Sequence, residues 1–192
     1  MISTIPRSSK EDVQSAVEAA QRAFPEWAVS SYDERAKWLD RIADALEEKS
    51  EEIARLESMD TGKPISLARE VDAARSVSNF RFFAEQVRNL QLQRFEMEDA
   101  SNHVLMNPVG IAGLITPWNL PLYLLSWKIA PAIAMGNTVV AKPSELTPMT
   151  ADLLAKTLVE VGLPQGVVNI IHGYGVEAGQ AIVEHPQVRL VS

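Results

Sequence analysis

The stretch NPVGIAGLITPWNLPLYLLSWKIAPAIAMGNTVVAKPSELTPMTA, from Asn107 to Ala151, determines the fold class of this chain. Its apolar segments 111–115 and 138–141 have the length and β-branched content of buried strands, and a helix is predicted over about 121–135 between them. Two strands joined by a helix form a βαβ unit, in which the strands are parallel. The stretch therefore predicts an α/β fold.

The same alternation continues toward the C-terminal end. The predicted elements are a helix with Thr147 as its N-cap, Pro148 at its first position and Val161-Gly162 at its end, a strand over 167–171, a short helix over 176–184 and a strand over 188–191. Repeated βαβ units predict an incomplete Rossmann-like, doubly wound parallel sheet. Such sheets bind ligands at the carboxyl ends of their strands, so functional residues are expected there.

The first half of the chain has helical periodicity instead. The predicted elements are a helix that Ser8 or Ser9 caps and Pro25 ends, a longer helix over about 33–59, a third over about 65–89, and a connecting hairpin over 90–109 that is β-like at 103–106. Residues 1–96 hold 14 Lys and Arg and 18 Asp and Glu, against 4 and 7 in residues 97–192. We therefore divide the chain into a helical segment with a connecting hairpin, 1–109, and a partial cofactor-binding βαβ unit, 110–192.

The composition excludes several classes of protein. The formal net charge of −7, from 18 Lys and Arg against 25 Asp and Glu, argues against a nucleic-acid binder. No apolar run reaches the roughly 18 residues of a membrane span, and the first residues lack an apolar signal region, so a cytoplasmic location without a membrane partner is expected. The absence of Cys excludes disulfides and a thiol nucleophile within these 192 residues. The three His residues show no metal-ligand spacing, and no metal site is expected.

Polar residues follow the first two predicted strands. Asn119 is placed to stabilise a developing oxyanion, with a cap on the next helix as the alternative. Lys142 and Glu145 are spaced to hold the ribose hydroxyls of a nucleotide, with a surface ion pair as the alternative. A carboxylate at this position would repel a 2′-phosphate and favour NAD over NADP.

Two further features are ambiguous. Gly173, Gly175 and Ala178 formally fit the phosphate fingerprint G-x-G-x-x-G/A, but glycines at these positions also permit a tight turn alone. Lys128 lies in an apolar helical stretch, where a buried charge needs an ion-pair or hydrogen-bond partner or has a functional role. Its side chain either reaches the surface or lies near the site.

Together these segments resemble the aldehyde dehydrogenase superfamily. The resemblance rests on the stretch quoted above, on GLPQGVVNIIHGYG with the following Gly179, and on ESMDTGKP, Glu57 to Pro64. The segment PWNLPLYLLSWKIAPA is most similar to the branch that acts on muconic semialdehydes. The resemblance implies oxidation of an aldehyde to the acid with NAD, through a Cys thiolate and a general-base Glu, in a protein that forms a homodimer or homotetramer.

The resemblance also implies a role for each matching residue. The implied roles are an oxyanion amide for Asn119, a charge relay for Lys128, a nicotinamide-side wall of Ile115, Thr116, Pro117 and Trp118, a ribose clamp of Lys142 and Glu145 with Pro143 and Ser144 between them, an adenine-side position for Gly175 and Gly179, and a carbonyl toward a monovalent cation for Leu146. The Phe-Thr-Gly-Ser turn, the Cys segment and the Glu-Leu-Gly-Gly segment of the family do not occur in the sequence. We therefore expect a part of an aldehyde dehydrogenase that lacks the catalytic domain and is inactive alone. The alternative is a non-catalytic chain that binds nucleotide or packs against relatives.

Overall fold

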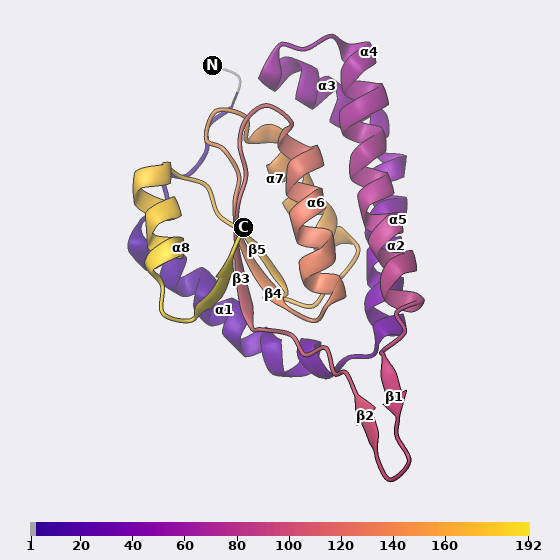
Figure 1. Ribbon diagram of the computed structural model, residues 1–192. Helices are drawn as coiled ribbons and strands as arrows, with labels where there is room; N and C mark the ends of the chain where they lie inside the picture. The colour runs from indigo at the N-terminus through magenta and orange to yellow at the C-terminus, as the bar shows by residue number, and fades with distance from the viewer. Residues whose placement is uncertain (1–2) are drawn as a thin grey trace.

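The computed structural model describes residues 3–192, and a four-stranded parallel sheet lies at its centre (Figure 1). The strands are β3 (Ile111–Ile115), β4 (Thr138–Lys142), β5 (Val168–Ile170) and β6 (Val188–Val191). Their order is β5-β4-β3-β6, with Ile115 of β3 opposite Lys142 of β4. The predicted α/β class with a parallel sheet is therefore confirmed.

Helices cover both faces of this sheet (Figure 1). The helices on one face are α1 (Lys10–Val29) and α8 (Gln180–Glu184), which follows a π-helical turn η2 (Gly175–Gly179), and those on the other face are α6 (Pro121–Ala134) and α7 (Met149–Glu160). A further layer packs on α6 and consists of α2 (Tyr32–Glu48) and α5 (Ala74–Arg88). Because α6 lies between the sheet and this outer layer, it is apolar around most of its circumference.

The helix α1 belongs to the same core as the sheet, although it comes from the charged first half of the chain. Ser9 begins the helix with a capping box that pairs it with Asp12. The buried face of α1 carries Val13 and Val17, which pack in one cluster with Val140 of β4. The helical segment therefore supplies one covering layer of the predicted sheet.

The structure corrects the predicted end of α1. The helix continues through Pro25 to Val29 instead of ending at the proline. Trp27 lies in the last turn, is buried, and donates a hydrogen bond from Nε1 to the Ile133 carbonyl at 3.1 Å. The packing of this indole stabilises a turn that the missing N–H of proline weakens.

The single helix predicted over 33–59 is two helices, α2 and α3 (Ser50–Thr61), separated at Lys49. The Ser50 hydroxyl donates to the Glu47 carbonyl at 2.7 Å and so competes with the helical pattern at the break. Gly62 ends α3 with a φ of 76°, a left-handed conformation that glycine adopts readily after a helix.

The third predicted helix, 65–89, is helical throughout but not uniform. It consists of α4 (Ile65–Leu67), a π-helical segment η1 (Ala68–Ala73) and α5. The short helix predicted over 176–184 likewise begins with the wider turn η2. Hydrophobic periodicity located both helices, but it does not distinguish a π-helical turn from an α-helical one.

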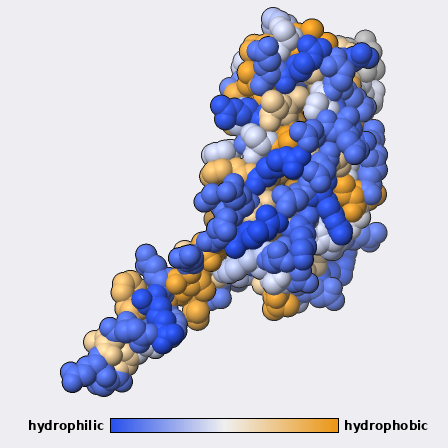
Figure 2. Space-filling model, turned by 90° about the vertical axis from the view of Figure 1, so that its right-hand side faces the viewer, coloured by the Kyte–Doolittle hydropathy of each residue, from blue (hydrophilic) through white to orange (hydrophobic). Residues whose placement is uncertain are grey.

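The connecting hairpin is formed by β1 (Arg94–Glu96) and β2 (Ser101–His103), which are antiparallel. The second strand lies at 101–103, so its prediction at 103–106 was wrong in position. The hairpin projects away from the helices, and Figure 2 shows apolar side chains near its base below a largely hydrophilic helical face. The exposed apolar side chains of this region include Phe95, Met97, Leu105 and Met106. Among residues 3–192, no helix is long and apolar enough to cross a bilayer.

Candidate cofactor and substrate site

The loops that follow β3 and β4 lie side by side at the carboxyl edge of the sheet. The Thr116 amide donates to the Lys142 carbonyl at 3.2 Å, and the Thr147 hydroxyl donates to the Trp118 carbonyl at 3.4 Å. The structure therefore brings together the two loops that contain most of the predicted site residues.

Lys142 is the most enclosed charge in these loops, with only 2% of its surface exposed. Its ammonium donates to the Pro143 carbonyl at 2.8 Å, the Gly173 carbonyl at 2.9 Å and Glu145 Oε2 at 3.1 Å. Three acceptors match the three N–H groups of a lysine, so the buried charge is fully hydrogen-bonded. The ion pair of the alternative interpretation is therefore present, but its lysine is buried and does not lie at the surface.

Glu145 lies at the boundary between this buried lysine and solvent. Its own backbone N–H lowers the pKa of Glu145, burial opposes this effect, and the Lys142 ammonium lowers the pKa further, so the carboxylate stays ionised near neutral pH. The Glu145 carboxylate accepts hydrogen bonds from the Lys142 ammonium, through Oε2 at 3.1 Å, and from its own backbone N–H. Glu145 also lines a cavity of about 270 Å³ together with Arg7 and Tyr174. The site thus offers a carboxylate that is held in place and remains half-exposed to solvent.

The glycines after β5 differ in their surroundings. A Cβ on Gly173, whose φ is 148°, would lie 3.1 Å from both the Ala178 Cβ and the Ser8 amide, so this glycine permits close packing. A Cβ on Gly175 would meet nothing within 4 Å, whereas one on Gly179 would lie 3.6 Å from the Lys142 side chain. Gly175 therefore faces open space, Gly179 packs against the Lys142 side chain, and Gly173 serves the turn.

Asn119 does not cap α6. The N-cap position is Leu120, and no side chain caps this helix. The Asn119 side chain is exposed and makes no hydrogen bond to any of residues 3–192. It lines a cavity of about 430 Å³ with Trp118, which is 58% exposed, and with the turn over 60–63. The capping alternative is therefore wrong, and the amide is free to act as a donor.

Lys128 reaches the carboxyl end of β3 from α6. Its Nζ donates to the Ile115 carbonyl at 2.9 Å, and burial lowers the pKa of this lysine. The side chain is half-buried and does not extend freely into solvent. Thr116, the next residue, is buried, and its hydroxyl has no partner within residues 3–192. A cation and an unused hydroxyl thus lie at the end of this strand.

The N-terminus of α7 is held by a residue that the sequence analysis did not single out. Asp60 accepts a hydrogen bond from the Met149 amide through Oδ2 at 2.9 Å, and the predicted cap by Thr147 is wrong. The capping carboxylate comes from a turn 89 positions away in the chain. No local pattern at the start of α7 could have indicated it.

A buried network of charges lies beside this turn. Lys63 Nζ donates to Asp72 Oδ2 at 2.8 Å and to Glu57 Oε1 at 3.3 Å, while the Thr150 hydroxyl donates to Glu57 Oε2 at 2.9 Å. Both carboxylates are fully buried. Burial raises the pKa of Glu57 to about 7, the Asp72 charge adds to this effect, and Lys63 opposes it. The sequence signal for this network was Asp72, an acidic residue on a buried helix face whose other residues are small.

The family assignment rests on the whole of the chain. The model of the aldehyde dehydrogenase family matches residues 1–192. The chain therefore belongs to the aldehyde dehydrogenase family, and the resemblance seen in its motifs is confirmed.

Individual relatives show the same relationship. The chain is 52% identical over 190 residues to the 2-aminomuconic semialdehyde dehydrogenase of Bos taurus and 41% identical over 199 residues to the 2-hydroxymuconic semialdehyde dehydrogenase of a Pseudomonas species. These matches cover 98% and 100% of this chain but only 39% and 41% of the two relatives. The NAD+ complex of the aldehyde dehydrogenase from Bacillus cereus is 41% identical with a TM-score of 0.92, over 96% of this chain and 38% of that one.

Proposed function

We propose that residues 110–192 bind NAD and that the protein acts in the NAD-dependent oxidation of an aldehyde to the carboxylic acid. The observation that carries this proposal is the pair formed by buried Lys142 and half-exposed Glu145 at the carboxyl end of β4. A half-exposed carboxylate, whose two oxygens carry about four acceptor sites, can accept hydrogen bonds from the two hydroxyls of a ribose. The NAD+ complex of a Bacillus cereus relative supports the choice of cofactor.

The residues present fit this cofactor. Glu145 would accept from the adenosine ribose, and its charge would repel the 2′-phosphate of NADP. Lys142 already donates to three acceptors, so its first role is to hold the Glu145 carboxylate and the Gly173 carbonyl in place. The open space at Gly175 and the backbone at Gly179, next to Lys142, would take the adenosine side. The nicotinamide side would lie against Ile115, Thr116, Pro117 and Trp118.

The chemistry at the other end of the site involves the substrate. When bound, NAD supplies the hydride acceptor of the oxidation. The free Asn119 amide would donate to the aldehyde oxygen and stabilise the negative charge that develops on it. The Lys128 ammonium would hold the Ile115 carbonyl and leave a positive charge behind the cofactor wall. Because the 192 residues contain no Cys, a thiol nucleophile must come from outside them.

The substrate class that we propose is a muconic semialdehyde, because relatives at 52% and 41% identity carry that substrate in their names. We further propose that residues 1–109 serve as the helical scaffold and that the exposed apolar residues of the hairpin contribute to a homo-oligomer. A cytoplasmic location stays a prediction, which fractionation of the source cells would test.

Calorimetric titration of the chain with NAD and NADP tests the proposal. We expect NAD to bind more tightly than NADP, and Glu145→Gln to weaken NAD binding about tenfold and to reduce the preference for NAD. Glu85→Gln, on the exposed face of α5, is the matched control and should bind NAD like the parent. No binding at millimolar NAD, or an unchanged Glu145→Gln variant, would refute the cofactor site. Sustained aldehyde-dependent formation of NADH would show that these residues need no external nucleophile.

A further inference from the structure

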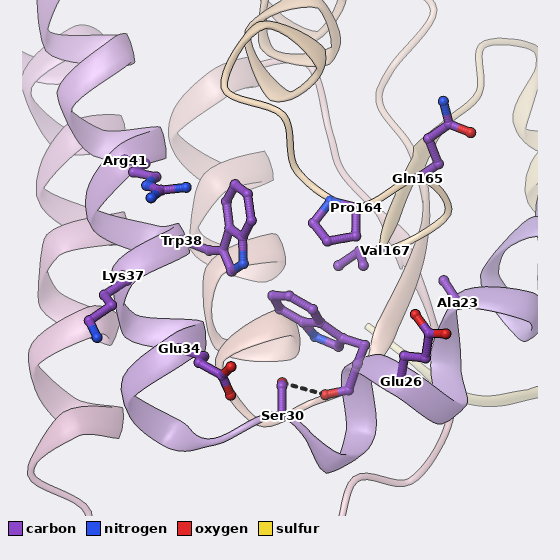
Figure 3. Close-up of a pocket in the computed structure, with 11 residues that line it drawn as sticks. Ala23, Glu26, Ser30, Glu34, Lys37, Trp38, Arg41, Pro164, Gln165 and Val167 are labelled. Atoms are coloured by element: carbon purple, nitrogen blue, oxygen red, sulfur yellow. Dashed lines mark hydrogen bonds between the residues drawn. The ribbon is translucent and has the colours of Figure 1, made fainter.

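A cavity separate from those already described lies at the opposite edge of the sheet from the proposed cofactor site. It has a volume of about 360 Å³ and is bounded by the end of α1, the first half of α2 and the loop that leads into β5 (Figure 3). That loop, with Pro164 and Val167, precedes β5, so the cavity is at the amino edge of the sheet. No residue of the proposed cofactor site lines it.

The walls of this cavity are flat and apolar. Trp27 is buried, and its indole is fixed by the hydrogen bond to the Ile133 carbonyl. The Trp38 indole is half-buried and lies opposite Pro164 and Val167 (Figure 3). The volume suits one ring with short substituents, and two indoles with a proline offer surfaces on which a planar ring can stack.

The rim of the cavity carries charges of both signs in different places. The Arg41 guanidinium lies 4.8 Å from the centre of the Trp38 ring and forms no ion pair with any of residues 3–192. Glu26, on α1, also forms no ion pair within the described part of the chain. Figure 3 shows these two side chains on opposite sides of the cavity, with Trp38 and Pro164 between them.

The other charges of the rim are already engaged. Lys37 pairs with Asp33 at 2.6 Å, and Glu34 accepts from the Ser31 amide at 2.8 Å in the cap of α2. The groups available to a ligand are therefore the cation of Arg41 and the anion of Glu26, at the two ends of an aromatic slot.

We propose that this cavity is a binding site for a small planar aromatic molecule with a carboxylate at one end and an ammonium group at the other. The ring would stack between Trp38 and Pro164, over the edge of Trp27. The carboxylate would pair with Arg41 and the ammonium with Glu26. A ligand with only one of these charges leaves the opposite rim group unpaired, so the site selects for the dipolar molecule.

The test uses three para-substituted benzenes: 4-(aminomethyl)benzoate, which carries both charges, 4-methylbenzoate, which carries only the carboxylate, and 4-methylbenzylamine, which carries only the ammonium group. The chain has 4 Trp residues, and their indole N–H signals in a ¹⁵N-correlated NMR spectrum report on individual sites. We expect the dipolar probe to shift the signals of Trp27 and Trp38 but not those of Trp118 and Trp127. For a molecule of this size the dissociation constant should be on the order of 1 mM.

Two variants separate the contributions of the rim charges. Arg41→Gln should weaken binding of the dipolar probe and of 4-methylbenzoate about fivefold and leave 4-methylbenzylamine unaffected. Glu26→Gln should instead weaken binding of the dipolar probe and of 4-methylbenzylamine, and leave 4-methylbenzoate unaffected. Arg22→Gln, an exposed arginine of α1 outside the cavity, is the matched control and should bind all three probes like the parent.

The same titrations define the results that overturn the proposal. Shifts spread over all four indoles, no shift at Trp27 and Trp38, or equal affinity for the three probes would each refute a dipolar aromatic site. Equal losses in Arg41→Gln and Arg22→Gln would show that net charge alone acts. Since both rim side chains lie at the protein surface, the indole spectra of the unliganded variants should match the parent, which keeps these outcomes interpretable.

Discussion

Replacement of Glu57 by Gln should remove a pH dependence of stability that originates in one buried charge. In the folded protein burial raises the pKa of Glu57 from 4.5 to about 7. The folded state therefore holds the Glu57 proton more tightly than the unfolded state. The stabilising effect of that proton is complete below pH 4.5 and is lost as the pH rises through 7.

The size of the effect follows from the two pKa values. At 1.36 kcal/mol for each unit of pKa, the difference corresponds to about 3 kcal/mol between the two ends of this range. Gln has the shape of the protonated acid and no charge, so it leaves Lys63 paired with Asp72 alone. Relative to the parent, Glu57→Gln should thus gain about 3 kcal/mol in its free energy of unfolding as the pH rises.

Urea denaturation of both proteins, followed by circular dichroism at several pH values from 4.5 to about 8, measures this difference. Groups that do not interact with Glu57 titrate equally in the two proteins and cancel in the comparison. Glu52→Gln, on the exposed face of the same helix α3, is the matched control and should follow the parent. A difference between parent and Glu57→Gln that stays constant over this range would refute the argument from burial.

Three further variants test other parts of the structure by thermal or urea denaturation. Lys142→Met leaves two buried carbonyls without a donor and should cost about 3 kcal/mol of stability as well as NAD binding; unchanged stability would contradict its buried position. Gly166→Ala places a Cβ 2.4 Å from the Ala19 carbonyl oxygen and should cost well over the roughly 1 kcal/mol expected for Gly162→Ala, which has a similar φ but open space; equal losses would exclude the clash. Asp60→Ala should lower stability by about 1 kcal/mol through loss of the α7 cap, and an unchanged midpoint would show that the amide has another partner.

The pattern of apolar residues within one segment was sufficient to predict those elements whose position depends on the burial of that segment alone. The strand predicted at 111–115 has these bounds in the structure, because a short apolar run flanked by Gly and Pro leaves few alternatives. The end of α1 was not predictable in this way. Pro25 weakens a helix locally, but Trp27 is held by Ile133, which lies 106 positions away. Tertiary packing there outweighs local propensity.

The candidate site also has features that the local sequence predicts and features that depend on tertiary contacts. The spacing of Lys142 and Glu145 and the order of the strands were enough to place these two residues together at one edge. The burial of Lys142 could not be predicted from the sequence, because its acceptor at Gly173 belongs to a different loop. The cap of α7 by Asp60 depends in the same way on a contact across the fold. Sequence identifies residues on one element, whereas partners contributed by other elements become visible only in the structure.

The packing of α1 against the central strands has a consequence for synthesis of the protein on the ribosome. The helix is complete at Val29, but β4, against which it packs, begins only at Thr138, 109 positions later. At ordinary translation rates the apolar face of α1 stays uncovered for on the order of 10 s. During that interval the nascent chain presents an amphipathic helix with an uncovered apolar face to solvent, which makes it a substrate for chaperones that shield emerging polypeptides.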